Sequence, residues 1–173
     1  YHFLSEYSLA ETFIMKSIDI DPDSYLSWFN LGKAYKKQKK FDDAIEVFLW
    51  SENLEENNTD ILNELGSTYF EINKKELSIK YIKKSLTLDP NNEKTLCLNA
   101  QLLQSDFKFS EAEVFYKKAI GVNENFSEAY SSLGYLYSVT NRIEEAISFL
   151  KKSLEIDPSQ VFPKYILASI YKK

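Results

Sequence analysis

Apolar residues recur along the chain at the spacing of three and four positions that is typical of amphipathic helices. Short polar segments, such as 37–40 and 139–142, separate neighbouring apolar windows and have the composition of turns. The pattern therefore predicts a chain of helices joined by short turns. We expect them near residues 8–20, 25–38, 42–55, 59–72, 76–88, 93–106, 110–122, 127–140, 144–156 and 160–172.

The same residue types return every 34 positions, which is the mark of a repeat array. Gly32, Gly66 and Gly134 share one column of this repeat, and Ala100 and Ala168 fill its remaining positions. Asp-Pro pairs recur as well, at 21–22, 89–90 and 157–158. Two further columns carry mostly tyrosine (Tyr1, Tyr35, Tyr69, Leu103, Tyr137, Tyr171) and mostly alanine (Ala10, Ala44, Ser78, Ala112, Ala146).

These columns have a direct physical meaning for packing. Small residues such as Gly32 and Ala44 let two helices cross closely, and larger residues such as Phe48 fill the space that is left. An Asp-Pro pair ends a helix, because proline lacks a backbone donor and the residue before it avoids the helical region. Three segments have the spacing of capping boxes and are expected to begin second helices: 73–76, 110–113 and 141–144.

The period and its residues resemble the tetratricopeptide repeat. Residues 25–58 match its pattern best, with Trp28, Leu31-Gly32, Tyr35, Ala44 and Phe48, although Glu56 stands where the family usually has proline. The resemblance implies an all-α, right-handed superhelical solenoid of antiparallel helix pairs. We expect 1–173 to be a single array and a fragment of a longer protein. Its parts would be a partial repeat (1–24), four repeats (25–58, 59–92, 93–126, 127–160) and a lone first helix (161–173).

Composition narrows the classes of function. A net charge of −5 gives no general footprint for nucleic acid, so we expect no nucleic-acid partner. No apolar run approaches the length of a membrane span, so we expect no membrane insertion. The single cysteine excludes an internal disulfide framework and favours a reducing compartment, which predicts a cytoplasmic protein.

Catalytic chemistry has little support in the sequence. The only histidine, His2, is far from the only cysteine, Cys97, so neither a zinc site nor a Cys-His pair is expected. Cys97 has apolar neighbours and is interpreted as a packed residue. Adjacent acidic pairs, such as Asp42-Asp43, do not face each other on a helix. We therefore expect no catalytic residue, no metal and no cofactor.

A binding surface is expected on the first helix of each repeat, where several columns change residue type freely. In the family that this chain resembles, such a face lines a concave groove that holds an extended or helical peptide. By that resemblance the groove residues would be Phe29, Lys33, Asn63, Ser67, Phe70, Cys97, Gln101, Ser131 and Tyr135. For Phe29 and Phe70, packing against the neighbouring repeat is an equally good interpretation.

The leading hypothesis is a non-catalytic protein–protein interaction scaffold that binds an extended peptide or a docking helix. Two alternatives stay open: the recruiting arm of a larger enzyme, such as a glycosyltransferase, and a structural segment of a fixed assembly. Residues 161–173 place Ile166, Leu167, Ile170 and Tyr171 at helical spacing with no helix after them. This predicts either a further repeat or self-association through the uncapped last helix.

Overall fold

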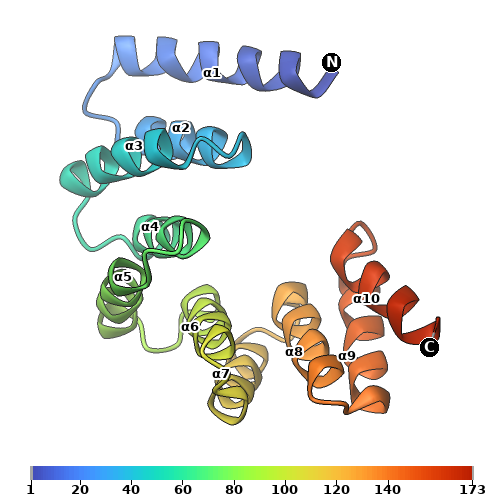
Figure 1. Cartoon of the computed structure of the whole chain (residues 1–173). Coiled ribbons are helices and arrows are strands. Elements are labelled where there is room, and N and C mark those ends of the chain that lie inside the picture. The colour runs from blue at the N-terminus through green and yellow to red at the C-terminus, as the bar shows by residue number, and fades with distance from the viewer. Residues whose placement is uncertain (1, 173) are drawn as a thin grey trace. The chain divides into compact units, whose positions relative to one another are not determined.

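The computed structural model describes the backbone of residues 2–172 and the side chains of residues 11–172. Expectations that concern the side chains of Tyr1, His2 and Ala10 lie outside the described residues. Within that part the chain forms ten α-helices and no strand, which confirms the all-α class (Figure 1). The helices are α1 (His2–Ile20), α2 (Tyr25–Lys37), α3 (Phe41–Leu54), α4 (Thr59–Glu71), α5 (Lys75–Leu88), α6 (Glu93–Ser105), α7 (Phe109–Val122), α8 (Ser127–Val139), α9 (Ile143–Ile156) and α10 (Val161–Tyr171).

Hydrophobic periodicity located these helices closely. The bounds of α2 to α10 differ from the expected windows by one residue at most. The exception is α1, which begins at His2 and not near residue 8.

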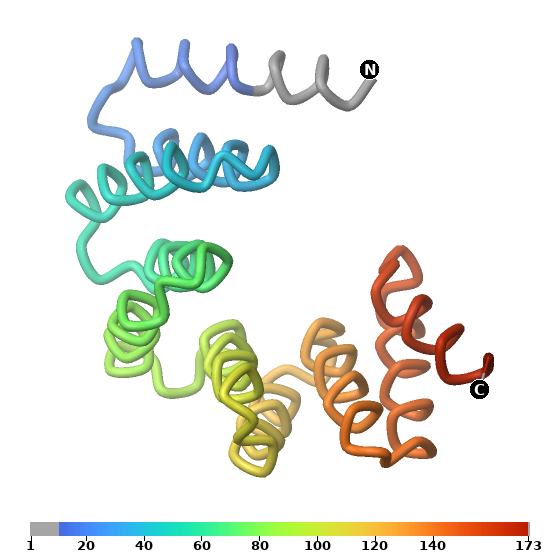
Figure 2. The backbone as a smooth tube through the Cα atoms, in the orientation of Figure 1, coloured from blue at the N-terminus to red at the C-terminus, as the bar shows by residue number. Residues whose placement is uncertain are grey.

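The helices fall into two compact units, Tyr1–Asp89 and Pro90–Lys173. In the first unit α2 pairs with α3 and α4 with α5, and α1 packs on α2. In the second unit α6 pairs with α7 and α8 with α9, and α10 packs on α8 and α9. The chain reverses direction at the tight turn inside each pair (Figure 2). Each unit is therefore built from antiparallel helix pairs.

The small columns allow a close approach inside the pairs. A Cβ atom added to Gly32 would lie 2.5 Å from ring atoms of Phe48, and one added to Gly134 would lie 2.7 Å from Cγ of Leu150. Phe48 and Leu150 are fully buried. At these two crossings glycine has no side chain, and the apolar side chain of the facing helix fills the space that this leaves.

The turns inside the pairs correct one expectation, because the three capping boxes are wrong. Asn73 and Asn141 do not cap the helices that follow them, but adopt left-handed backbone at the end of the preceding helix, with φ of 59° and 62°. The next residue's N–H then bonds a carbonyl five positions back, as from Arg142 to Tyr137 at 2.8 Å. This is the Schellman arrangement, for which asparagine is well suited. Ser110 lies inside α7.

The last helix is covered more than expected. Ile166 is buried, since α10 packs on both α8 and α9. Leu167 and Ile170 are half-buried and Tyr171 is exposed. The expectation of an uncovered face is thus wrong for Ile166 and holds for Tyr171.

A left-handed phenylalanine gives the first testable prediction. Phe107 has φ of 60° at the position that Asn73 and Asn141 occupy in other pairs, and its side chain is 80% exposed. A bulky side chain is unfavourable in this conformation, whereas asparagine tolerates it. We expect Phe107→Asn to raise the free energy of unfolding by about 1 kcal/mol, measured by urea denaturation. The reverse exchange, Asn141→Phe, is the control and should lower it; a destabilised Phe107→Asn protein would contradict the argument.

A buried hydroxyl gives the second testable prediction. Ser78 Oγ is buried in α5 without a hydrogen-bond partner, in the column where Ala44, Ala112 and Ala146 are buried. Removing an unsatisfied polar group is favourable, so Ser78→Ala should raise stability by about 1 kcal/mol. Ser51 is the matched control, because its buried Oγ donates to the Tyr25 carbonyl oxygen at 2.9 Å. Ser51→Ala should therefore lower the urea midpoint. Equal shifts in both variants would refute the explanation.

Candidate functional site

In the first unit the expected binding residues lie on α2 and α4, which contact each other. Lys33 is exposed, and its Nζ lies 5.4 Å from the centroid of the Phe29 ring. The Phe29 ring in turn packs on Phe48 of α3, with centroids 5.9 Å apart, and stays half-buried. Phe29 therefore fits both the packing and the binding interpretation. Its ring packs on the buried Phe48, and it also lies near the cation of the exposed Lys33. Phe70 on α4 is also half-buried.

An ion pair ties these two helices together. Lys36 Nζ on α2 donates to Glu64 Oε2 on α4 at 2.7 Å and also to Ser67 Oγ. Both charged side chains keep about a quarter of their surface exposed. Ser67 Oγ donates in turn to the Glu64 carbonyl oxygen at 3.1 Å. Ser67 is therefore part of a polar bridge between α2 and α4.

Three expected binding residues are buried. Cys97 on α6 is 1% exposed, and Asn63 and Ser131 are also buried. Burial raises the pKa of the Cys97 thiol well above its usual value, which makes the thiol unreactive. Ser85 Oγ donates to Asn63 Oδ1 at 3.4 Å, and Ser131 Oγ donates to the Glu128 carbonyl oxygen at 2.9 Å. In this conformation these three side chains support the helices and offer little surface to a partner.

In the second unit the remaining expected residues make contacts between helices. Gln101 Nε2 on α6 donates to Glu128 Oε1 on α8 at 3.3 Å. The Tyr135 ring on α8 meets the Phe162 ring on α10 edge-on, with centroids 5.5 Å apart. Glu128 and Phe162 were not among the expected residues, although they contact two of them. Both lie in a column whose residue type varies between repeats, and that was the available signal.

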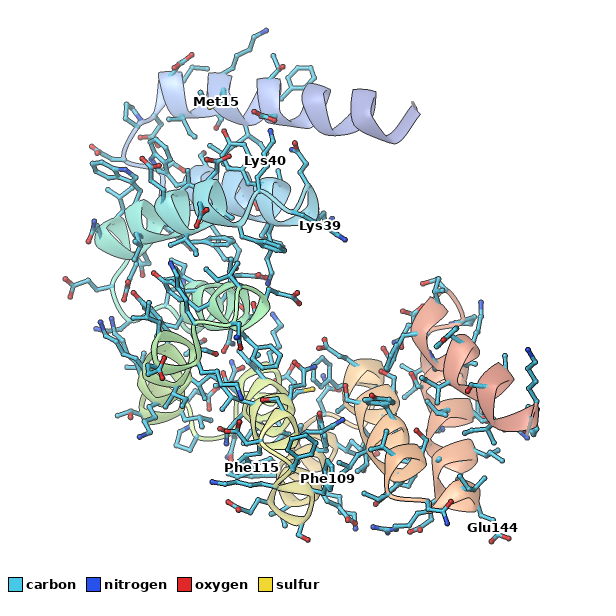
Figure 3. The ribbon with its side chains drawn as sticks, viewed as in Figure 1. Met15, Lys39, Lys40, Phe109, Phe115 and Glu144 are labelled. Atoms are coloured by element: carbon cyan, nitrogen blue, oxygen red, sulfur yellow. The ribbon has the colours of Figure 1, made fainter. Side chains whose placement is uncertain are left out.

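The turn between α2 and α3 adds positive charge to the first unit. Lys39 and Lys40 extend from it and are exposed (Figure 3). Lys40 Nζ lies 5.3 Å from the centroid of the Tyr35 ring. Burial and the carboxylates of Glu11 and Asp43 raise the pKa of Tyr35, so its hydroxyl stays protonated.

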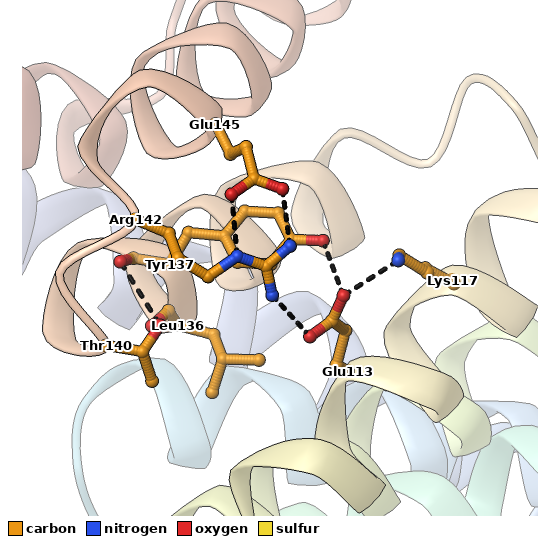
Figure 4. Close-up of polar contacts among 7 residues, drawn as sticks. All are labelled: Glu113, Lys117, Leu136, Tyr137, Thr140, Arg142 and Glu145. Carbon is orange, nitrogen blue, oxygen red and sulfur yellow. Dashed lines mark hydrogen bonds and ion pairs between the residues drawn. The ribbon is translucent and has the colours of Figure 1, made fainter.

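A polar network in the second unit joins α7 to α8 and α9 (Figure 4). Glu113 accepts hydrogen bonds from Lys117 at 2.7 Å, from the Tyr137 hydroxyl at 2.9 Å and from Arg142 at 2.7 Å. The Arg142 guanidinium lies 4.0 Å from the centroid of the Tyr137 ring and also pairs with Glu145. Burial opposes ionisation of Glu113, but these three donors outweigh it and lower the pKa of Glu113 to about 2. The network therefore connects the pair α6–α7 to the pair α8–α9.

Two findings bear on other classes of site. Among the described side chains, no three histidine, cysteine or acidic residues come together in a way that could ligate a metal ion. No helix in the described part combines the length and the apolar character that crossing a bilayer requires.

Family models decide the relationship of the chain to known proteins. Models described as "Tetratricopeptide repeat" match residues 13–46, 59–92 and 127–160, which together make up more than half of the chain. The chain belongs to the tetratricopeptide repeat family. The tetratricopeptide matches at 59–92 and 127–160 have the bounds of two expected repeats, whereas 13–46 begins in α1 and ends in α3.

Individual relatives are longer proteins. The chain is 30% identical over 163 residues to the anaphase-promoting complex subunit CDC16 of Saccharomyces cerevisiae, covering 90% of this chain and 19% of that protein. It is 25% identical over 182 residues to the protein O-mannosyl-transferase TMTC3 of Mus musculus, and this match covers 96% of this chain and 19% of that protein. The chain thus spans about a fifth of the length of these curated relatives.

A solved structure supports the fold. The crystal structure of the APC/C hetero-tetramer Cut9–Hcn1 superposes with a TM-score of 0.88 at 18% identity, covering 99% of this chain and 34% of that one. At this identity the likeness establishes the tetratricopeptide fold alone.

The Glu113 network gives a prediction with a defined pH dependence. The pKa of Glu113 in the folded protein is about 2, which lies below the ordinary value of 4.5 for a glutamate. The stabilisation is therefore complete above the unfolded pKa and is lost as the pH falls toward 2. At neutral pH we expect Glu113→Gln to lower the free energy of unfolding by about 1 kcal/mol, since the group is partly screened by solvent.

Urea denaturation of both proteins at neutral pH and near pH 3 measures this effect. The difference between wild type and Glu113→Gln should shrink at the lower pH. Glu111→Gln is the matched control, because Glu111 lies on the same helix and is exposed. A difference for Glu113→Gln that did not change with pH would show that the charge contributes nothing.

Proposed function

We propose that this chain is a non-catalytic protein-interaction segment that binds an extended peptide or a docking helix on its first helices. Membership of the tetratricopeptide repeat family supports a scaffold role. The observation that carries the proposal is the contrast on those helices between buried packing residues and accessible side chains of varied chemistry. Leu31 and Leu133 are buried, whereas Lys33 is exposed and Gln101 is half-buried.

The accessible residues would act differently in the two units. In the first unit, Lys33 and Phe70 offer a cation and an aromatic edge. In the second unit, Gln101 and Tyr135 offer an amide and a second aromatic. Such a set suits a ligand with apolar anchors and free backbone hydrogen-bonding groups. The buried Asn63, Cys97 and Ser131 would contribute by holding the helices in place.

A second candidate role is the recruiting arm of a larger enzyme. The match to the mannosyl-transferase TMTC3 covers nearly all of this chain but only a fifth of that relative. In such a protein this segment would bind the substrate or a partner, and catalysis would belong to another domain. The complete coding sequence decides between the roles, because an enzyme would carry a recognisable catalytic domain beside the repeats.

The proposal extends to the compartment and to self-association. The single, buried and free Cys97 fits a reducing compartment such as the cytoplasm. Phe162, Tyr165 and Tyr171 expose aromatic surface on α10, which would suit a further helix of the protein or self-association of two copies. Light scattering at several protein concentrations tests the self-association.

Substitution of single aromatic residues tests the binding face. Peptides selected from a random library against the immobilised protein provide the ligand, and calorimetry provides the affinity. Phe70→Ala and Tyr135→Ala should each weaken binding about 5- to 30-fold, because an aromatic anchor contributes roughly 1–2 kcal/mol.

Circular dichroism should show unchanged helicity in both variants. Val114→Ala on α7 is the control, because Val114 is an exposed apolar residue of a second helix. Wild-type affinity in both aromatic variants, together with loss of binding when charges on the second helices are reversed, would place the site on the other face.

A further inference from the structure

The two tryptophans of the chain form one cluster in the first unit. Trp28 on α2 and Trp50 on α3 stack with ring centroids 6.1 Å apart and an angle of 24° between the rings. Trp50 is 53% exposed, so a large part of an aromatic side chain faces solvent. Exposed tryptophan is unusual on a protein surface and common at binding hot spots.

Packing of the repeat does not require an aromatic residue at this place. The equivalent positions in the other second helices hold Lys84, Lys118 and Lys152, and α1 has Lys16 in the same column. Lys118 and Lys152 are exposed, and Lys84 pairs with Glu52 at 2.6 Å. Lys118 Nζ donates to the Pro90 carbonyl oxygen at 2.8 Å, and Lys152 Nζ pairs with Glu155 at 3.2 Å. A lysine side chain is therefore sufficient for the fold at this position, and the indole of Trp50 is an addition to it.

The cluster is held rigidly. Trp28 Nε1 donates to the Pro22 carbonyl oxygen at 2.8 Å, which fixes the ring against the turn between α1 and α2. The inner side of Trp28 packs against the buried residues Ile18, Leu31 and Val47. The Trp28 ring is thus placed before any ligand arrives, and Trp50 stacks on it. This order lowers the conformational entropy that binding would cost.

Carboxylates flank the turn that Trp28 of this cluster contacts. Asp21 and Asp23 flank Pro22, the residue that Trp28 contacts, and Asp19 lies in the last turn of α1. All three are exposed, and none forms an ion pair with another described residue. Lys16 on α1 lies instead near the Phe13 ring, with Nζ 5.9 Å from its centroid. Lys16 also borders the same hollow as Asp19, so Asp21 and Asp23 are the carboxylates left without a nearby described cation partner. The cluster therefore combines an aromatic face with two exposed carboxylates.

We propose that Trp28, Trp50, Asp21 and Asp23 form a second binding surface, which takes an arginine-bearing segment of a partner protein. A guanidinium group is planar, so it can stack on an indole face while its N–H groups bond to a carboxylate. The ammonium of lysine offers a point charge without that stacking. This surface shares no residue with the proposed peptide-binding face of the first helices, and its test is independent of that proposal.

The cluster supplies its own spectroscopic signal, because the chain has no other tryptophan. Intrinsic tryptophan fluorescence is followed while a synthetic arginine–glycine peptide is added to the protein, and calorimetry gives the affinity. Lysine–glycine and glutamate–glycine peptides of the same length are compared. We expect a saturable change with the arginine peptide, several-fold weaker binding of the lysine peptide, no binding of the glutamate peptide, and weakening by salt.

Variants separate the two parts of the surface. Trp50→Lys introduces the residue that the other repeats carry, so it should fold normally and bind the arginine peptide about tenfold more weakly. The double variant Asp21→Asn, Asp23→Asn should also bind weakly and should lose most of the salt dependence. Phe107→Asn, at an exposed aromatic of the other unit, should bind like wild type.

Three results would overturn the proposal. The first is the absence of a saturable change in fluorescence with the arginine peptide. The second is wild-type affinity of Trp50→Lys in calorimetry. The third is binding of the glutamate peptide as tight as that of the arginine peptide, which would indicate non-specific binding to an exposed indole.

Discussion

The close crossing of paired helices is the constraint on which the described parts of this protein depend. At Gly32 and Gly134 no side chain separates the backbones, and Phe48 and Leu150 fill the space. A Cβ at either position would lie within 3 Å of these side chains, so the packing of the crossing would have to shift. Each pair therefore depends on one column of small residues facing one column of large ones. Repetition of this contact every 34 residues explains why the period is visible in the sequence.

Features that depend on this contact could be predicted, and features that depend on longer-range contacts could not. Helix positions followed from periodicity, because burial of one face dictates the spacing of apolar residues. The turns were misjudged, since asparagine is favoured both as a helix N-cap and in left-handed backbone. Asn73 adopts the second of these states, whereas Asn58 caps α4 by accepting from Asp60 N and Ile61 N. Spacing alone does not distinguish the two.

The candidate site shows a similar limit. Variation between repeats marks positions that the helix crossing does not require, but it does not show whether the side chain at such a position is buried. Cys97 and Gln101 both belong to varying columns of α6, and only Gln101 reaches the surface. The Glu113 network was invisible for a different reason. Its partners come from α7, α8 and the turn before α9, and Glu113 replaces the isoleucine found at the equivalent positions Ile45, Ile79 and Ile147.

Specific functions in a repeat protein therefore belong to the residues that the repeat does not determine. Trp50 illustrates this, because lysine fills the same position at the four other places along the chain, Lys16, Lys84, Lys118 and Lys152. An indole in place of lysine removes a positive charge from this part of the first unit and adds an aromatic face. Both changes favour a cationic ligand, and neither disturbs the helix crossing beneath. A stable crossing thus leaves the outer positions of each pair free to acquire separate binding chemistries.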